Sequence, residues 1–263
     1  MQLNKIDFII KTFERYDCLG ELLESIEKFY PGATLFIADD SSEINKDFYA
    51  EWNKKLKITL IELPFNGGLS FGRNMILEYT SAPYILLLDD DFIFTEETKI
   101  ERFLDVLENS NAMICGGCTI HNGNEERYEF NIEYSNGVLT KKKISQEGIK
   151  VGGQTVYKTD SVLNFFLADA ELFKYVRWDN SLKLSEHLSF FLDFKLAGFL
   201  CYYLPDVKII HTKKRNANYN YFRKKGKEYQ IEAFTKARVK KIIDETIGQV
   251  HELKDNNINI SML

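Results

Sequence analysis

The chain has 263 residues, of which 44% are hydrophobic and 28% are charged. This composition supports a buried core and excludes a globally disordered chain, and the length suits one large α/β domain or one domain with a C-terminal extension. The net charge of −5 argues against general nucleic-acid binding. No stretch of the sequence approaches the roughly 20 apolar residues of a membrane span. No secretory signal opens it, so we expect a cytoplasmic protein with reduced cysteines.

The first elements alternate between apolar strands and an amphipathic helix. Residues 6–12 and 34–38 are short apolar runs that predict buried strands, and residues 17–30 carry leucine and isoleucine at helical spacing. Pro31 and Gly32 end that helix. The order strand, helix, strand predicts a parallel pair of strands with a crossover helix.

The same alternation continues to residue 118. Further helices are predicted over residues 48–56, 70–79 and 95–108. Residues 58–63 predict a third strand, and residues 84–88 (YILLL) are typical of a central parallel strand that is covered on both faces. We therefore expect an α/β fold with a Rossmann-like, mostly parallel central sheet flanked by helices, and we assign residues 1–118 to its nucleotide-binding half.

The pattern changes after residue 118. Asn136 and Gly137 divide residues 127–144 into two runs and predict a β-hairpin with an Asn-Gly turn. Further elements are expected over residues 162–168, 199–203 and 207–210 as strands and over residues 185–197 as a helix. Residues 119–215 are assigned to a mixed, acceptor-side and catalytic half of the same domain. Residues 216–263 are expected to form a charged, helical extension that dimerises, lies on a membrane or packs back.

Acidic and polar clusters follow three of the predicted strands. They are residues 12–15, the pair Asp39 and Asp40, and the triplet Asp89, Asp90 and Asp91. Parallel α/β sheets bind ligands outside the carboxyl ends of their strands. Three consecutive carboxylates repel one another, and a divalent cation would compensate their charge. Because Mg²⁺ and Mn²⁺ bridge carboxylates to diphosphate oxygens, the triplet predicts a metal–diphosphate site; the alternative is a helix cap or a solvated loop.

Four other residues are candidates for chemistry. His211 closes the strand predicted over residues 207–210 and is either a metal ligand or a structural histidine. Arg73 lies early in a helix and either reaches a diphosphate or lies on the surface. Glu186 and His187 begin another helix, where either could act as a general base, or where the glutamate simply favours the helix dipole.

Several enzyme classes lack their signatures here. The first strand is followed by Phe13-Glu14-Arg15-Tyr16 rather than by a glycine-rich phosphate loop, which disfavours NAD enzymes, P-loop enzymes and sugar nucleotidyltransferases. Cys115 and Cys118 have the spacing of a redox or zinc motif, but no second paired motif completes a zinc site. We interpret these cysteines as structural.

Six segments together resemble glycosyltransferases of the GT-A fold, in particular those of the family 2 type. They are IIKTFERYD at residues 9–17, IADDSS at 37–42, NGGLSFGRN at 66–74, YILLLDDDF at 84–92, RWDNSLKLSEHLSFF at 177–191 and PDVKIIH at 205–211. The last two, with KTFERYD and DDDFIFTEETKIE, are most similar to the β-1,4-N-acetylgalactosaminyltransferases of ganglioside synthesis.

The resemblance implies an inverting transferase that uses Mn²⁺ or Mg²⁺. It would move a sugar, with GalNAc favoured over Gal and GlcNAc, from a UDP-sugar to a glycan or a lipid-linked saccharide. Asp91 and His211 would bind the metal, and Glu186 falls in the acidic stretch that supplies the base. The donor-binding candidates from the strand ends and the resemblance are Thr12, Arg15, Asp39, Asp40, Arg73, Asp89 and Asp90.

Two departures from the family pattern leave alternatives open. Leu188 and Ser189 follow Glu186 and His187 where the family usually has more acid, so the base stays between Glu186 and His187. A non-catalytic nucleotide-sugar- or glycan-binding protein is the alternative function. The chain also shows no membrane anchor, and its basic segment, residues 208–227, either contacts the inner face of a membrane or a phosphate-bearing substrate, or is a solvated surface.

Overall fold

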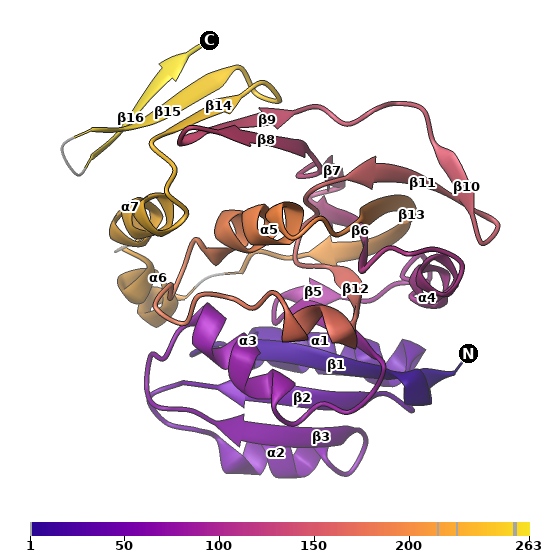
Figure 1. Cartoon of the computed structure of the whole chain (residues 1–263). Coiled ribbons are helices and arrows are strands. Elements are labelled where there is room, and N and C mark those ends of the chain that lie inside the picture. Colours follow the sequence, from indigo (N-terminus) through magenta and orange to yellow (C-terminus); the bar gives the residue numbers. More distant parts are fainter. Residues whose placement is uncertain (1, 215, 225, 255–256) are drawn as a thin grey trace.

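Strands and helices alternate along the described residues, 2–214, 216–224, 226–254 and 257–263, of the computed structural model (Figure 1). In chain order the strands are β1 (Ile6–Thr12), β2 (Thr34–Asp39), β3 (Lys57–Glu62), β4 (Tyr84–Asp89), β5 (Phe92–Ile93), β6 (Ile114–His121), β7 (Asn124–Glu126), β8 (Asn131–Ser135), β9 (Val138–Lys142), β10 (Ile149–Val151), β11 (Gln154–Thr159), β12 (Phe166–Asp169), β13 (Cys201–His211), β14 (Lys241–Asp244), β15 (Gln249–Lys254) and β16 (Asn257–Met262).

The helices are α1 (Tyr16–Phe29), α2 (Lys46–Trp52), α3 (Leu69–Leu77), α4 (Glu101–Glu108), α5 (Glu186–Leu196), α6 (Ala217–Arg223) and α7 (Gly226–Lys236), with 3-10 turns at Leu3–Lys5 and Ala170–Lys174. None of the helices in the described part of the chain is both long and apolar enough to cross a membrane.

The first half of the main sheet is parallel, as predicted. Its strands lie in the order β4-β1-β2-β3, and each neighbouring pair runs in the same direction. The register pairs Lys11 with Asp89 and Thr12 with Asp39, so the polar residues that follow these strands meet at one edge of the sheet. All seven residues of β1 are buried, as expected for a strand covered on both faces.

Alternate residues of β1 supply two separate cores. Ile6, Phe8 and Ile10 pack into a cluster that also contains buried residues of α1 and α4. Ile9 points to the other face and joins a cluster with buried phenylalanines of α5. Because successive side chains of a strand point to opposite faces, this one apolar run is enough to hold helices on both sides of the sheet.

The second half of the sheet is mixed, because antiparallel strands interrupt the common direction of the others. β12 runs antiparallel to both β4 and β6, while β13 is parallel to β6. The two strands predicted over residues 199–203 and 207–210 form the single strand β13, whose register shifts between Tyr203 and Lys208. The predicted half boundary at residue 118 falls inside β6, so the sheet continues from one half into the other.

The two cysteines of β6, Cys115 and Cys118, point to opposite faces of the sheet. Cys115 packs into the cluster that contains Phe8, whereas Cys118 packs into the cluster on the opposite face. Both thiols are free and buried, and burial raises their pKa. Two thiols on opposite faces of one strand cannot share a disulfide or a metal ion, which agrees with their interpretation as structural residues.

The helical extension predicted over residues 216–263 is wrong in its second part. The extension begins with α6 and α7, but β14, β15 and β16 follow and form a five-stranded sheet with the hairpin β8–β9. β14 pairs in parallel with β9, which matches Ile242 to Leu139, and both residues are buried. The pairing with a distant hairpin outweighs the helical propensity of the many charged residues in this segment.

The hairpin itself has the predicted turn. Asn136 and Gly137 both have positive φ angles, 52° and 79°, as the type I′ turn of a two-residue hairpin requires. In Figure 1 the small sheet lies beyond α5 from the main sheet, so that α5 is held between the two sheets. The aromatic residues of α5 share one core cluster with Ile132 of β8 and Leu139 of β9.

Candidate active site

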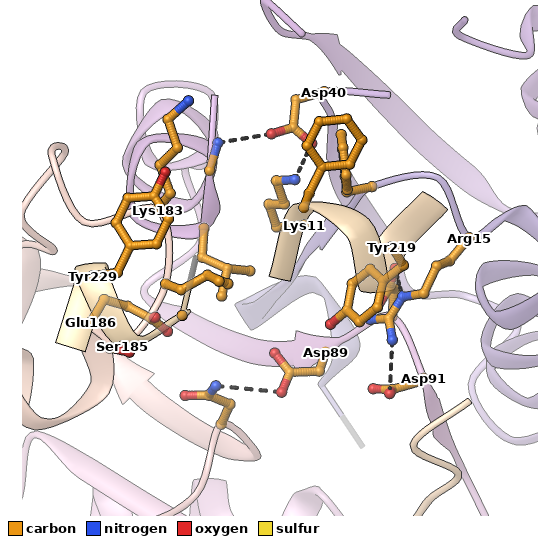
Figure 2. Close-up of a pocket in the computed structure, with 18 of the residues that line it drawn as sticks. Lys11, Arg15, Asp40, Asp89, Asp91, Lys183, Ser185, Glu186, Tyr219 and Tyr229 are labelled. Carbon is orange, nitrogen blue, oxygen red and sulfur yellow. Dashed lines mark hydrogen bonds and ion pairs between the residues drawn. The ribbon is translucent and has the colours of Figure 1, made fainter. Parts of the chain in front are cut away.

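A cavity of about 520 Å³ opens at the carboxyl ends of β1, β2 and β4. We call it the donor cavity. Lys11, Asp40 and residues 89–91 line it from the strand ends. The start of α5, His211 at the end of β13, and residues of α6 and α7 line it from the other side. In the view of Figure 2, Asp89 lies between Glu186 and the Arg15–Asp91 pair.

The three aspartates after β4 are each paired with protein cations. Asp89 accepts a hydrogen bond from Arg73 at 3.0 Å, and Asp90 forms an ion pair with Arg15. Asp91 is 3.1 Å from the Arg15 guanidinium and 3.5 Å from His211 Nε2. Burial would lower the pKa of Arg15, but the adjacent Asp90 and Asp91 carboxylates raise it.

These contacts correct the electrostatic argument made from the sequence. From the sequence we expect a divalent cation to compensate the charge of the triplet, but Arg15 and Arg73 already supply positive charge from within the protein. A metal site must therefore be judged from the ligands themselves. Asp91 of the triplet, together with His211 at the end of β13, offers both an oxygen and a nitrogen ligand.

His211 is held in an orientation that suits metal binding. Its Nδ1 is 2.8 Å from Glu126 Oε2 and its Nε2 faces Asp91. Since a carboxylate only accepts, Glu126 fixes the proton on Nδ1 and leaves Nε2 for the cavity side, the arrangement that commonly supports metal-bound histidines. Burial would lower the pKa of His211, but its hydrogen bonds to Asp91 and Glu126 raise it.

The protein offers only part of the coordination shell of a metal ion. Within the described ranges, no group of three or more His, Cys, Asp and Glu side chains converges as a metal site. Mg²⁺ characteristically uses one or two carboxylates and takes its other ligands from water and substrate phosphates. Asp91 and His211 fit an ion of this kind, which would complete its shell with ligand oxygens.

Arg73 connects the donor side of the cavity to the acceptor side. It is fully buried and donates to Asp89 and, at 2.6 Å, to Glu186 Oε1. The sequence suggested that this arginine reaches a diphosphate, but it does not line the cavity. It instead holds the carboxylates of β4 and α5 near each other.

His187 belongs to a hydrogen-bonded chain at the wall of the cavity. Its Nδ1 lies 3.0 Å from the side-chain oxygen of Asn164, and the Asn164 amide donates to Asp89 at 3.4 Å. Because the amide oxygen only accepts, Nδ1 carries the proton. Burial, together with Arg73 and Lys141, lowers the pKa of His187 to about 3, which keeps the ring neutral.

Two predicted donor-binding residues lie behind the cavity wall. Thr12 donates to Asp90 at 2.8 Å and is buried. Asp39 is fully buried and accepts hydrogen bonds from the Tyr16 and Tyr49 hydroxyls at 2.6 and 2.8 Å. Neither residue lines the cavity: Thr12 supports Asp90, which does, whereas the tyrosine partners of Asp39 also lie outside the lining. Of the donor-binding candidates, Arg15, Asp40, Asp89 and Asp90 line it.

Aromatic side chains from the C-terminal extension complete the cavity, and the sequence analysis missed them. Tyr219 of α6 lies over the Arg15 guanidinium with 4.0 Å between the guanidinium carbon and the ring centre. Phe222 contacts Phe13 edge to face at 5.2 Å, and Tyr229 of α7 reaches the opposite side (Figure 2). No local sequence signal marks these residues, because they meet the strand ends only through the fold.

Comparisons with known proteins agree with this arrangement. A family model described as "Glycosyl transferase family 2" matches residues 7–166, more than half of the chain. β-1,4 N-acetylgalactosaminyltransferase 2 of Mus musculus is 35% identical over 214 residues, which cover 79% of this chain and 39% of that protein. The chain therefore spans about two fifths of the length of that relative.

Solved structures of glycosyltransferases share the fold. S. aureus TarS 1-349 in complex with UDP-GlcNAc aligns with a TM-score of 0.60 at 18% identity, covering 82% of this chain and 60% of that chain. GalNAc-T7 with UDP, GalNAc and Mn²⁺ aligns with a TM-score of 0.64 at 12% identity, covering 89% and 47%. The GT-A architecture expected from the sequence is thus confirmed, and the chain belongs to glycosyl transferase family 2.

Proposed function

We propose that this chain is an inverting, metal-dependent glycosyltransferase that moves a sugar, with GalNAc favoured, from a UDP-sugar to a glycan or lipid-linked acceptor. The observation that carries the proposal is the composition of one cavity. It brings together the strand-end aspartates, the Asp91–His211 pair and the Glu186 carboxylate. The likeness to a β-1,4 N-acetylgalactosaminyltransferase supports the choice of sugar.

The donor would lie along the strand ends. Phe13 and Phe222 offer aromatic faces at the end of the cavity near Asp40, which suits a nucleobase. Asp91 and His211 would hold Mn²⁺ or Mg²⁺, and this ion would neutralise charge on the leaving diphosphate. Asp89 would then face the sugar or ribose, since it lies between Asp91 and Glu186 in the cavity.

Glu186 is our candidate for the general base. In the transfer, the acceptor oxygen would bond to the anomeric carbon of the sugar while the bond from that carbon to the diphosphate oxygen breaks. The bonding electron pair leaves with UDP, and the acceptor proton moves to the Glu186 carboxylate. His187 is a weaker candidate, because its pKa of about 3 makes the neutral ring a poor proton acceptor.

The test combines binding with turnover. UDP- and GDP-sugars are screened for thermal stabilisation with and without Mn²⁺, and release of UDP is followed for the sugars that bind. We expect metal-dependent stabilisation by a UDP-sugar and slow UDP release. Binding without any release would favour the non-catalytic alternative, and the absence of any nucleotide-sugar binding would refute the proposal.

Two variants separate the roles of the side chains. Asp91→Asn should abolish the heat of Mn²⁺-dependent UDP binding in a calorimetric titration. Glu186→Gln should keep UDP affinity but lower turnover by about 10²–10⁴-fold, the usual contribution of a general base. Normal turnover by Glu186→Gln would move the role of base to another group.

A further inference from the structure

We propose that a second cavity beside the donor cavity binds one sugar residue of the acceptor. This inference rests on the proposed function and adds a location and a ligand class to it. The second cavity has a volume of about 190 Å³ and lies among the hairpin β8–β9, α5, α7 and the first strands of the C-terminal sheet. Sites for drug-sized ligands span roughly 300–1,000 Å³, so this smaller cavity suits a single sugar ring.

The two cavities are neighbours that share part of their lining. Ser185 and His187 line both of them, while Glu186, which lies between these two residues in the sequence, faces the donor cavity. A sugar bound in the second cavity would therefore lie beside the carboxylate that we propose as the base.

Helix α7 covers both cavities with one face. Gly226 and Tyr229 line the donor cavity, and Gln230, Ala233 and Phe234 line the second cavity. These positions repeat at intervals of three and four residues, which is the spacing of a single helix face. Since one helix forms a wall of both spaces, ligands bound in the two cavities would lie side by side along α7.

The wall of the second cavity combines an aromatic ring with polar groups. Tyr128 packs against His187 with 4.8 Å between ring centres, and Gln230, Ser189 and His251 offer hydrogen-bonding groups. Phe234 and Ile242 form an apolar part. A sugar ring has an apolar face and a polar edge, so this combination fits a saccharide better than a lipid chain or a peptide.

The charge of the wall points to a neutral sugar. Lys141 is the cation of this cavity, but it is 3.3 Å from Asp244 and both side chains are largely buried. His251 is partly buried, and its pKa is lowered first by burial and then by Lys141. The lysine charge is thus compensated within the protein, and the remaining lining groups are uncharged at neutral pH.

The test fills the second cavity and measures the acceptor. Gln230 lies on an exposed part of α7, so Gln230→Trp should fold while its side chain occupies the cavity mouth. Glu228→Trp is the matched control, because Glu228 is exposed on the same helix and lines neither cavity. Four acceptors are compared, the p-nitrophenyl β-glycosides of galactose, glucose, GlcNAc and GalNAc. The probe is the one that the wild type glycosylates fastest.

We expect Gln230→Trp to raise the KM for this glycoside at least about tenfold, which corresponds to about 1.4 kcal/mol of binding. The KM for the UDP-sugar should change far less, and Glu228→Trp should behave as the wild type. Tyr128→Ala should also raise the glycoside KM by removing the aromatic wall. Equal glycoside KM values in the two tryptophan variants would overturn the inference.

A binding measurement distinguishes failure of this inference from failure of the proposed function. Saturation-transfer NMR reports binding of the same four glycosides to the wild-type protein whether or not turnover occurs. Loss of the NMR signal in Gln230→Trp but not in Glu228→Trp supports the second cavity even if no UDP-sugar is consumed. Retention of the signal in both variants, with transfer intact, refutes the second cavity and leaves the transferase proposal standing.

Discussion

Arg73 is a buried cation that joins two carboxylates from different elements of the site. It donates to Asp89 and Glu186 from a position that is 1% exposed. Removing one member of a buried ion pair leaves an uncompensated charge, which costs far more than the pair contributes when intact. The stability of the protein should therefore depend strongly on this single side chain.

Replacing Arg73 by methionine tests this dependence. We expect Arg73→Met to lower the free energy of unfolding by about 3–5 kcal/mol, measured by urea denaturation. The matched control is Arg177→Met, because Arg177 pairs with Glu78 on the surface and such pairs contribute only about 0–1 kcal/mol. Similar losses of unfolding free energy in the two variants would mean that the pairing of Arg73 with Asp89 and Glu186 contributes no more than a surface ion pair.

His187 should make stability depend on pH. Burial, Arg73 and Lys141 lower its pKa to about 3 in the folded protein, while an unfolded histidine titrates near a pKa of roughly 6.5. Between these two values the unfolded chain binds one more proton than the folded chain. The contribution of His187 to stability is therefore complete above about pH 6.5 and is lost as the pH falls toward 3.

Comparison with His187→Gln isolates this effect from other groups, including His211, whose pKa is raised. From pH 7.5 to 5.5 the wild type should lose about 1.4 kcal/mol more stability than the variant. Urea unfolding at the two pH values gives both numbers. An equal loss in wild type and variant would mean that His187 takes up its proton over this pH range in the folded protein as it does in the unfolded chain.

The sequence predicted the aspartates that line the donor cavity better than the residues that hydrogen-bond to the histidines of the site. Asp40, Asp89 and Asp91 were found because they follow apolar strands, and parallel pairing brings such positions together whatever the details of packing. Glu126 and Asn164 were missed. Glu126 bonds to His211, and Asn164 bonds to His187. The partners are 85 and 23 residues apart in the sequence, and no local pattern encodes such a contact.

At the scale of elements, the turn before α3 brings two loops into close contact. Gly68 has a φ of +100°, and its backbone approaches Lys183 so closely that an added Cβ atom would lie 2.6 Å from the Lys183 Cα. Leu69 donates to the Lys183 carbonyl at 3.1 Å, and Lys183 Nζ donates to the Asn66 carbonyl at 2.6 Å. These contacts hold the loop before α5 against the edge of the donor cavity.

Gly68→Ala should therefore destabilise the protein for two reasons. Gly153→Ala is the control, since Gly153 also has a positive φ, +79°, but no atom lies within 4 Å of an added Cβ. A backbone cost of about 1–3 kcal/mol applies to both substitutions, and only Gly68→Ala adds the roughly 1–3 kcal/mol of overpacking. Urea denaturation should show this difference; equal losses would mean that the Lys183 loop moves away without cost.

The C-terminal strands show why the extension could not be predicted from its own residues. Residues 241–254 carry five charged and five apolar residues among fourteen, and this mixed pattern fits a helix as well as a strand. The decisive contacts are elsewhere, in the pairing of β14 with β9 and in the burial of Val239 and Ile242 against the hairpin. Element types fixed by distant partners are where local propensity is least informative.

At the scale of the molecule, three lysines of the basic segment, residues 208–227, pair with acidic residues. Lys208 lies 3.2 Å from Glu125, Lys213 pairs with Glu126, and Lys214 pairs with Glu21. Arg215 and Lys225, which the same prediction included, lie outside the described residues. The paired lysines Lys213 and Lys214 connect the chain after β13 to β7 and α1. Contact with an anionic membrane stays a prediction, and these paired lysines support it less than unpaired ones would.

The small C-terminal sheet shares its core with the main sheet. Ile132, Leu139, Val239 and Ile242 belong to the same buried cluster as Ile9 and Phe166. Two parts of a chain that share one core are expected to unfold together. A change made in the small sheet should therefore alter the unfolding of the main sheet, even where no direct contact connects the two places.

Asp244→Asn tests this coupling. Asp244 is buried in β14 and pairs with Lys141 of β9 at 3.3 Å, so the variant leaves a largely buried lysine without its partner. Both tryptophans, Trp52 and Trp178, lie outside the small sheet. We expect Asp244→Asn to shift the urea midpoint of tryptophan fluorescence and that of far-UV circular dichroism by the same amount.

The control for this experiment is Glu133→Gln, which breaks an exposed pair with Lys142 on the same small sheet. Exposed pairs contribute little to stability, so its midpoints should match those of the wild type. If Asp244→Asn shifted only the circular dichroism and left the tryptophan midpoint in place, the small sheet would unfold as a separate unit. The wall that it gives to the second cavity would then be lost before the donor cavity unfolds.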